Sequence, residues 1–354
     1  MRSVMNHRRT ASNVLPAIMI WLGAITSFAS AQGGETAFEV HEWGTFTEVA
    51  GSDGAAVPWW TLSHRGPAEL PEFVQMNPGT AKLGHAFRTR METPVLYFYP
   101  SAPMSVRIDT EYKSGVITEW FPAAVWTPAF GITPEGSPVH WLIDLLPPGD
   151  DAKDQVPLVG ERGHHYAHAR EVPDAWLVRN TQSTEEAQVE KFIFYRGGGQ
   201  STLPLMTTNN TEGKIEIHQQ YGFQVDQAWL VHPSNGSMAW KQLTGMADPA
   251  GALPRLFETT LPESTSPMAT SGPPLEASLK SSLVDAGLSE AEAAAMVATW
   301  SEAWLGEDGL RVLYLLPRQW IDENLPLKFS PQPTRRERVF VARSELITPT
   351  QEEA

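Results

Sequence analysis

The pattern of apolar and polar residues predicts β-strands over most of the chain. Short runs that alternate in polarity, or that are continuously apolar and rich in β-branched and aromatic residues, recur between Gly and Pro residues. The clearest runs are residues 38–49, 95–99, 104–112, 116–121, 139–146, 175–178, 190–195, 215–218, 223–225, 228–232, 310–316 and 339–343. The three runs between residues 95 and 121 follow closely on one another, which is typical of a meander. We therefore expect a mainly β protein, built as an antiparallel sandwich or as two merged sheets.

The period of the apolar pattern changes towards the C-terminus. Apolar residues there recur every fourth position, first at Leu275, Leu279 and Leu283, and then at Met296, Trp300 and Trp304. Ser289 and Glu292 have the spacing of a capping box that opens the second of these segments. We expect a helical hairpin over residues 275–306 that packs its apolar face on the β core.

These patterns divide the chain into five parts. The parts are a signal peptide at residues 1–31, a β-rich domain at 32–262, a linker rich in Ser, Thr and Pro at 263–274, the helical hairpin at 275–306, and C-terminal strands with a frayed tail at 307–354. The run at residues 310–316 is apolar throughout, which favours a buried strand. We therefore expect the C-terminal part to complete the β core.

The N-terminal segment has the features of an export signal. Arg2, Arg8 and Arg9 form a basic region, residues 14–28 are largely apolar, and Ala29-Ser30-Ala31 supplies small residues for cleavage. The apolar stretch is short for a membrane span, so we expect cleavage and no stable membrane insertion afterwards. The predicted location is the periplasm or the extracellular space, and an uncleaved N-terminal anchor is the alternative.

Composition narrows the class of partner. The chain has no cysteine, so packing, or a bound metal, must replace the disulfides that many exported proteins use. Its formal net charge is −15, and the first 31 residues contain three Arg and no acidic residue, which makes the remainder −18. An acidic chain repels phosphate backbones, and we therefore expect no nucleic-acid partner.

Several short motifs resemble those of one protein family. They are His41-Glu42-Trp43-Gly44-Thr45-Phe46-Thr47, Met91-Glu92-Thr93-Pro94-Val95, Thr118-Glu119-Trp120, Phe194-Tyr195-Arg196-Gly197 and Ala294-Ala295-Met296-Val297-Ala298-Thr299-Trp300. Together they resemble an uncharacterised family of exported bacterial proteins with an N-terminal His-Glu-Trp-Gly-Thr-Phe-Thr signature. The resemblance spans most of the chain after the signal segment. It implies export and a single structural unit, and it carries no assigned reaction, cofactor or catalytic residue.

Two Glu-Trp pairs in predicted strands suggest chemistry: Glu42-Trp43 and Glu119-Trp120. A glycoside hydrolase needs two carboxylates flanking the scissile bond, one of them with a raised pKa, and aromatic faces that hold the sugar. If neighbouring strands bring the two Glu side chains together, they and His41 are candidate catalytic residues. The alternative is that each Glu forms a structural ion pair with an arginine. The candidate arginines are Arg90, Arg107 and Arg196.

Histidines supply a second candidate site. They are His41, His85, His164, His165 and His168. With Glu42 or Asp53 they include enough imidazole and carboxylate groups for a divalent metal ion held by three protein ligands, with a fourth position open for water. The residues between His164 and His168 lack the Glu of the His-Glu-x-x-His motif. The alternative is a partly exposed histidine cluster that holds no metal.

Aromatic and cationic side chains are candidates for binding a substrate: Trp43, Trp59, Trp60, Trp120 and Arg196. Trp59 and Trp60 lie in a Pro-rich segment, residues 55–81, where a long loop is expected. Their rings could stack on a sugar, or they could anchor the loop by burial. Arg196 precedes three glycines, a sequence that suits either an anion contact or a turn.

Two classes of function remain open. The first is a non-catalytic exported binding or scaffold protein that contacts a glycan or another cell-envelope component, and we place it first because abundant Trp and a single β core need no chemistry. The second is an exported hydrolase that uses Glu42 and Glu119 or a metal held near His41. An enzyme should bring His41 and Glu42 together with other candidates in an open cleft. Burial of Glu42 against an arginine, on the opposite side of a sheet from His41, would contradict the catalytic interpretation.

Overall fold

The computed structural model describes residues 37–60, 70–77, 86–126, 136, 138–160, 164–180, 187–220, 222–243, 256–260, 266–267 and 274–353. All of them belong to one compact unit, Thr36–Ala354, which is separate from Met1–Glu35. The expected signal peptide at residues 1–31 lies outside the described residues, as does most of the expected linker at 263–274. Within the described part, no helix is long and apolar enough to cross a membrane.

The described strands confirm a mainly β protein with several sheets. The largest sheet has the order β18 (Ser266–Pro267), β16 (Ser237–Leu243), β15 (Ala228–Ser234), β19 (Leu310–Leu315), β21 (Arg335–Leu346), β1 (Phe38–Ala50), β5 (Thr89–Pro100), β12 (Ile193–Gly199), β7 (Gly115–Phe121) and β3 (Gln75–Met76). A six-stranded sheet contains β11 (Val189–Glu190), β10 (Leu177–Asn180), β9 (Val139–Leu146), β6 (Met104–Thr110), β20 (Leu327–Ser330) and β8 (Val125–Trp126). Smaller sheets pair β13 (Leu205–Asn209), β14 (Lys214–Gln219) and β17 (Leu256–Thr260), and β2 (Trp59–Trp60) with β4 (Ala86–Phe87).

The predicted meander between residues 95 and 121 is wrong. β6 leaves for the six-stranded sheet, and β12 separates β5 from β7 in the large sheet. β12 comes much later in the chain, so the pairing is long-range and local spacing could not reveal it. The C-terminal strands β19 and β21 lie inside the large sheet, between β15 and β1.

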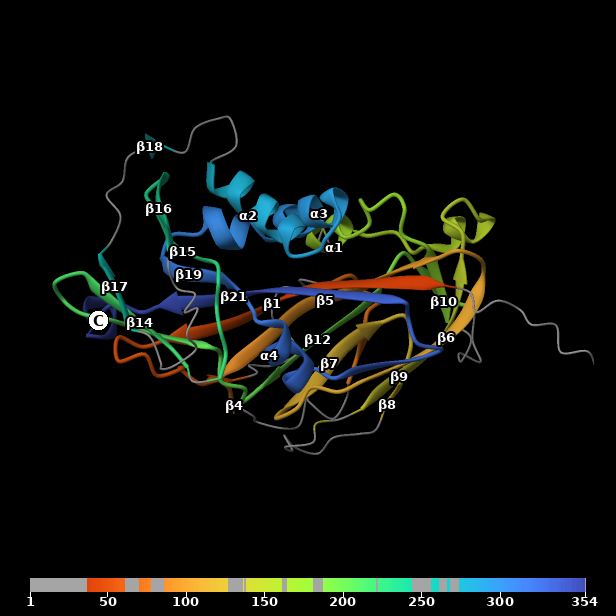
Figure 1. The fold of residues 1–354 in the computed structure, drawn as a ribbon, viewed down its shortest axis with the longest axis horizontal. Coiled ribbons are helices and arrows are strands. Elements are labelled where there is room, and N and C mark those ends of the chain that lie inside the picture. The colour runs from red at the N-terminus through yellow and green to blue at the C-terminus, as the bar shows by residue number, and fades with distance from the viewer. Residues whose placement is uncertain are drawn as a thin grey trace, which may run out of the picture. The chain divides into compact units, whose positions relative to one another are not determined.

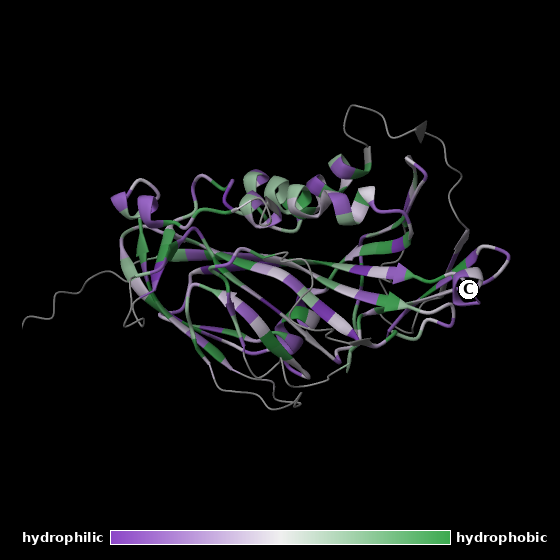
Figure 2. Ribbon diagram, turned by 180° about the vertical axis from the view of Figure 1, so that it is seen from behind, coloured by the Kyte–Doolittle hydropathy of each residue, from purple (hydrophilic) through white to green (hydrophobic). Residues whose placement is uncertain are grey.

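Strand β1 organises the large sheet because it pairs on both sides along most of its length. It runs parallel to β21 and antiparallel to β5. Successive side chains of a strand point to opposite faces, so Val40 and Phe46 enter one apolar cluster and Trp43 enters another. The alternation of apolar and polar residues along these strands is visible in Figure 2. A long strand that is apolar on both faces must be covered on both faces.

Each face of β1 has its own cover (Figure 1). On one face, β1 packs with residues of β6 and β9 such as Ile108 and Trp141. On the other, it packs with helices α2 (Pro274–Asp285) and α3 (Glu290–Ser301), through Leu275, Leu279 and Met296 among others. Helix α1 (His164–His168) contacts α3 on this side. The two covers use the two faces of one sheet as separate cores.

The ends of the C-terminal helices follow local rules. Ser289 and Glu292 form the predicted capping box at the start of α3, and a π-helical turn, η4 (Glu302–Gly306), follows it. The other short helices are η2 (Asp151–Gln155), α4 (Arg318–Asn324) and α5 (Pro349–Glu352). The prediction of a frayed tail is wrong, because Thr348 caps α5 and Glu352 accepts a hydrogen bond of 2.7 Å from the Ser52 main-chain nitrogen.

Candidate functional site

His41 and Glu42 occupy the middle of β1 and point to opposite faces of the large sheet. Glu42 contacts Tyr195 and Arg338 on the face covered by the six-stranded sheet. His41 contacts Glu292, which belongs to α3 on the other face. Neighbouring residues of a strand cannot turn their side chains to the same face without a bulge, and the irregularity in the β1–β5 pairing comes later, between Trp43 and Thr45. The two titratable groups therefore belong to separate sites.

Glu42 is completely buried and is neutralised by protein groups. Its carboxylate accepts hydrogen bonds from the Tyr195 hydroxyl and from Nε of Arg338. Burial, and next the Glu42 charge, holds the pKa of Tyr195 well above its usual value, so this hydroxyl stays a donor. Burial acts to lower the pKa of Arg338, but the Glu42 charge outweighs it and the net shift is upward. Both lone-pair sets of the carboxylate are thus engaged inside the core.

Glu119 has an arginine partner of its own. Nε of Arg196 lies 3.1 Å from its carboxylate, and the Thr118 hydroxyl donates to it as well. Alternation along β7 places Glu119 on the side of Phe121, which packs in the helix-side cluster. The prediction that Glu42 and Glu119 form a two-carboxylate catalytic site is therefore wrong, because the two groups lie on opposite faces and each is paired with an arginine. Arg196 serves this ion pair.

The tryptophans predicted to bind a sugar are not available for it where the structure describes their side chains. Trp43 is 0% exposed and Trp120 is 1% exposed. Trp120 also donates from Nε1 to the side chain of Gln75 at 3.0 Å. An indole with no exposed face cannot stack on a ligand, so these two assignments are wrong. Trp59 and Trp60 form β2, and their side chains lie outside the described residues.

His41 belongs to a buried polar cluster with Glu292 and Tyr99. Its Nδ1 lies 2.9 Å from one Glu292 oxygen and 3.1 Å from the other, and the Tyr99 hydroxyl donates to the same carboxylate at 2.6 Å. The Ser289 main-chain nitrogen adds the capping-box bond at 2.7 Å. Burial acts to raise the pKa of Glu292, but the hydrogen bond and charge of His41 outweigh it and the pKa is lowered. The cluster ties β1 and β5 to the first turn of α3.

Nε2 of His41 points to the edge of this cluster. It is buried, and within the described part of the chain it has no hydrogen-bond partner, while a Glu39 oxygen lies 3.8 Å away. The pattern of a carboxylate on Nδ1 is the one that orients a catalytic imidazole. A nucleophile would have to stand at Nε2, and among the described residues no Ser, Thr or Lys is bonded there. The cluster therefore acts as a fastening between sheet and helix.

The predicted metal site does not assemble where it can be examined. His165 contacts Glu302 at 3.7 Å and His168 contacts Glu171 at 3.4 Å, both near the molecular surface. His85 and the side chain of His164 lie outside the described residues. Among the residues that are described, no three His, Cys, Asp or Glu side chains are arranged to hold a metal ion. The metal assignment of His41 with His165 and His168 is wrong, because His41 is bound to Glu292 and the other two pair with their own acids.

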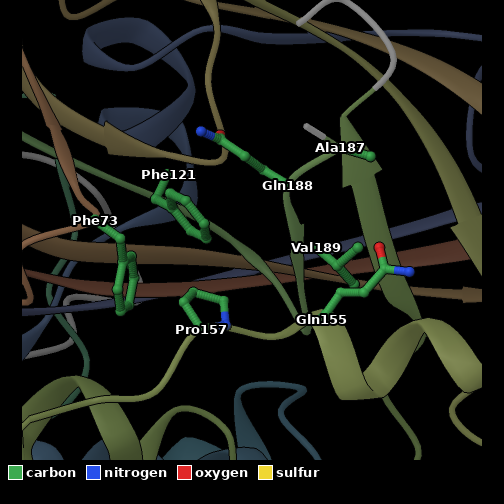
Figure 3. A pocket seen from close by; sticks show the side chains of 7 residues that line it. All are labelled: Phe73, Phe121, Gln155, Pro157, Ala187, Gln188 and Val189. Atoms are coloured by element: carbon green, nitrogen blue, oxygen red, sulfur yellow. The ribbon is translucent and has the colours of Figure 1, made fainter. Parts of the chain in front are cut away.

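A neutral hollow of about 370 Å³ was not predicted from the sequence (Figure 3). It is lined by Phe73, Phe121, Gln155, Pro157, Ala187, Gln188 and Val189. The two phenyl rings lie on one side with centroids 4.7 Å apart, and Val189 and Gln155 lie on the other. No lining residue is charged, and most of them are partly exposed, so a ligand can reach the hollow.

The residues around the hollow hold it in shape. The guanidinium of Arg170 lies 5.7 Å from the centre of the Phe73 ring and donates a 2.8 Å hydrogen bond to the Pro157 carbonyl. Arg170 is itself held by buried Glu190 at 2.6 Å. The Gln188 side-chain oxygen accepts from the main chain of Ala123 at 2.6 Å. The only sequence signal for this site was a Phe in a Pro-rich segment, which is too common to select.

Comparison with known proteins assigns no reaction to any of these groups. No protein-family model matches the chain, and no curated protein matches it. The arrangement of the described residues is therefore the basis for a functional proposal. It combines acids that are already paired with a neutral hollow that is reachable from solvent.

Proposed function

We propose that this protein is an exported bacterial protein that binds a glycan or another envelope component without catalysing a reaction. The N-terminal segment, with its basic start and the small residues Ala29-Ser30-Ala31, supports export to the periplasm or beyond. The resemblance to the family with the His-Glu-Trp-Gly-Thr-Phe-Thr signature supports the same location. Net charge argues against nucleic acid as the partner.

The proposed fold is a β-sandwich with a helical hairpin on its outer face. The apolar cluster shared by β1, β6 and β9 supports two stacked sheets. The capping box of α3 and the shared burial of α2 and α3 against the large sheet support the hairpin. This arrangement leaves the ends of the sheets, where loops gather, for binding.

The observation that carries the proposal is the neutral hollow beside Phe73. Sugars offer apolar C–H faces together with many hydroxyl groups. Aromatic rings match the first and amide side chains match the second. Phe73 and Phe121 supply the rings, and Gln155 and Gln188 supply amides. The volume of about 370 Å³ falls at the small end of ligand sites and suits one or two sugar rings.

The surroundings of the signature residues also favour binding over catalysis. Glu42 neutralises Arg338 inside the core, and His41 fastens helix α3 to the sheet. Both therefore have a structural reason to be present. No arrangement among the described residues favours the alternative of an exported hydrolase.

A binding experiment tests this proposal. The mature protein from Gln32 would be applied to a glycan array, and the best ligand, together with N-acetylchitotetraose as a defined probe, would be titrated by calorimetry. We expect Phe73→Ala and Gln155→Ala each to weaken binding by about ten-fold, which corresponds to about 1.4 kcal/mol. Met206→Ala, a change at a partly exposed residue that does not line the hollow, should bind like the wild type. Failure of the wild type to bind any glycan, or equal binding by all variants, would overturn the proposal.

A further inference from the structure

A second cavity, of about 280 Å³, lies where β19 ends and β21 continues. Three segments form its walls: the loop before β15, the end of α2, and the turn from β19 into α4. Its lining residues are Gln224, Asp226, Gln227, Asp285, Ala286, Leu315, Leu316, Pro317, Arg318, Arg338 and Val339. The cavity shares no residue with the hollow beside Phe73.

The floor of this cavity is the main chain of β21 at Arg338. The β19 ladder ends with the Leu316 N–H, which donates to the Phe340 carbonyl at 2.8 Å. Further along β21, the Arg318 side chain donates to the Arg336 carbonyl at 3.1 Å. Alternate residues of a strand direct their N–H and C=O groups to the same neighbour. Arg338, midway between these two residues, therefore directs its main-chain groups into the cavity.

These main-chain groups of Arg338 are left without a strand partner. The β19–β21 pairing ends at Leu315 and Val341, and within the part of the chain that the structure describes no strand residue pairs with Arg338 on this side. Arg338 is 4% exposed as a whole although its side chain is 0% exposed. Its exposed atoms are therefore main-chain atoms. An unpaired N–H and C=O side by side form the complement of one peptide group.

The mouth of the cavity is acidic. Asp226 and Asp285 are both exposed there, and Asp285 is the last residue of α2, where the helix dipole adds negative potential. The positive group in the lining, Arg318, is already engaged by Asp322 at 2.9 Å and by the Arg336 carbonyl. The Arg338 guanidinium is engaged by Glu42 and Asp322. The unspent charge at the mouth is negative, which favours a cation and opposes a free carboxylate.

We infer that this cavity binds the amino-terminal end of an extended peptide. The terminal ammonium group lies between Asp226 and Asp285, and the first peptide group pairs with the main chain of Arg338, where it continues the ladder that β19 leaves unfinished. This is a form of strand addition combined with capture of a terminal amine. A simple amine would leave the Arg338 groups unpaired, and a sugar would not use the acidic mouth. The site is independent of the proposed glycan site.

The test uses tripeptide amides of the form Xaa-Ala-Ala and their N-acetylated counterparts as probes. Binding to the mature protein would be followed by the backbone amide signals of Arg338 and Ala286 in NMR spectra and quantified by calorimetry. We expect at least one free amine series to bind and to shift both signals, and acetylation to weaken it by about ten-fold or more, because a charge-assisted bond is lost. Equal binding of the acetylated forms, or no binding of any tripeptide, would overturn the inference.

Two kinds of variant separate the site from general effects. Asp226→Asn with Asp285→Asn removes the acidic mouth and should weaken the free amine forms by about ten-fold while leaving acetylated forms unchanged. Ala286→Trp, at an exposed residue of the mouth, should block the cavity without touching the core. Glu212→Gln, an exposed acid in the β13–β14 turn, is the matched charge control and should bind like the wild type. Binding that survives Ala286→Trp with unchanged signals at Arg338 would also overturn it.

Discussion

Glu42 of β1 and Arg338 of β21 stand at the same register position on neighbouring parallel strands and form an ion pair with neither side chain exposed. They come from opposite ends of the chain, and the pair lies in the middle of the largest sheet. Arg338 also donates to Asp322 of α4 at 2.8 Å, so the pair extends to a helix that follows β19. A glutamate that local sequence suggests for catalysis here closes the fold between its N-terminal and C-terminal strands.

Breaking this ion pair should destabilise the fold strongly. Arg338→Ala leaves the Glu42 charge buried with only Tyr195 as a donor, and loss of one member of a buried pair costs about 3 to 5 kcal/mol. Chemical denaturation should measure this loss. Arg335→Ala, which removes a half-exposed arginine from the same strand, should change stability by less than about 0.5 kcal/mol.

A double variant distinguishes an unpaired charge from lost packing. Glu42→Leu with Arg338→Met replaces both charges by apolar groups and should recover much of the stability lost in Arg338→Ala. If the double variant is as unstable as the single one, the cost does not come from an unpaired buried charge.

Glu48 should make stability depend on pH near neutrality. Burial, partly offset by a 2.9 Å hydrogen bond from Ser344, raises its pKa from 4.5 to about 7. Because the folded protein holds this proton more tightly than the unfolded chain, the contribution is favourable below pH 4.5 and is lost as pH rises through about 7. The difference is about 3 kcal/mol across that window.

The variant Glu48→Gln should remove this dependence. Its unfolding free energy should exceed that of the wild type at pH 8 and approach it near pH 5, since glutamine does not titrate. The difference between the two proteins, measured by urea denaturation at several pH values, isolates Glu48 from the other acids. A difference that is constant with pH would contradict the raised pKa.

Local sequence patterns predicted elements better than their partners. The strands around residues 38–49 and 139–146 and the capping box of α3 follow from periodicity and from Ser289 with Glu292, which are local signals. Residues 223–225 look like a strand but form a loop in which Val225 is buried. An apolar residue is needed in the core whether it comes from a strand or a loop, so the pattern alone cannot separate the two.

The site was harder to predict because its partners are distant in sequence. His41 lies 251 positions from Glu292, and Glu42 lies 296 positions from Arg338. The sequence shows that an acid and an imidazole are adjacent, but alternation turns them to opposite faces, where different elements meet them. Glu292 was recognised as a capping residue, and its second role, as the acceptor for His41, depends on where the helix docks.

Loss of the His41–Glu292 contact should loosen α3 before the sheet. His41→Ala leaves the buried Glu292 carboxylate without its imidazole donor, which should cost about 1 to 3 kcal/mol. Hydrogen exchange should show the larger increase in the first turns of α3, because Tyr99 and Ser289 still hold the carboxylate but β1 no longer does. His168→Ala, at a partly exposed histidine paired with Glu171, should leave this exchange unchanged.

Gly44 in the signature should tolerate no side chain. A Cβ at this position would lie 2.7 Å from a ring carbon of Phe340 and 3.0 Å from Cα of Pro94, and the second of these contacts is main chain that cannot turn away. Phe340 is fully buried and packs against Phe46, so it has little room to move. Gly44→Ala should therefore lower stability by about 1 to 3 kcal/mol, as overpacking does. Gly149→Ala is the matched control, because nothing lies within 4 Å of its Cβ position, and its effect should stay within about 0.5 kcal/mol. Equal thermal midpoints for the two variants would mean that the β1–β21 contact is looser than these distances require, and that the glycine of the signature is not there for packing.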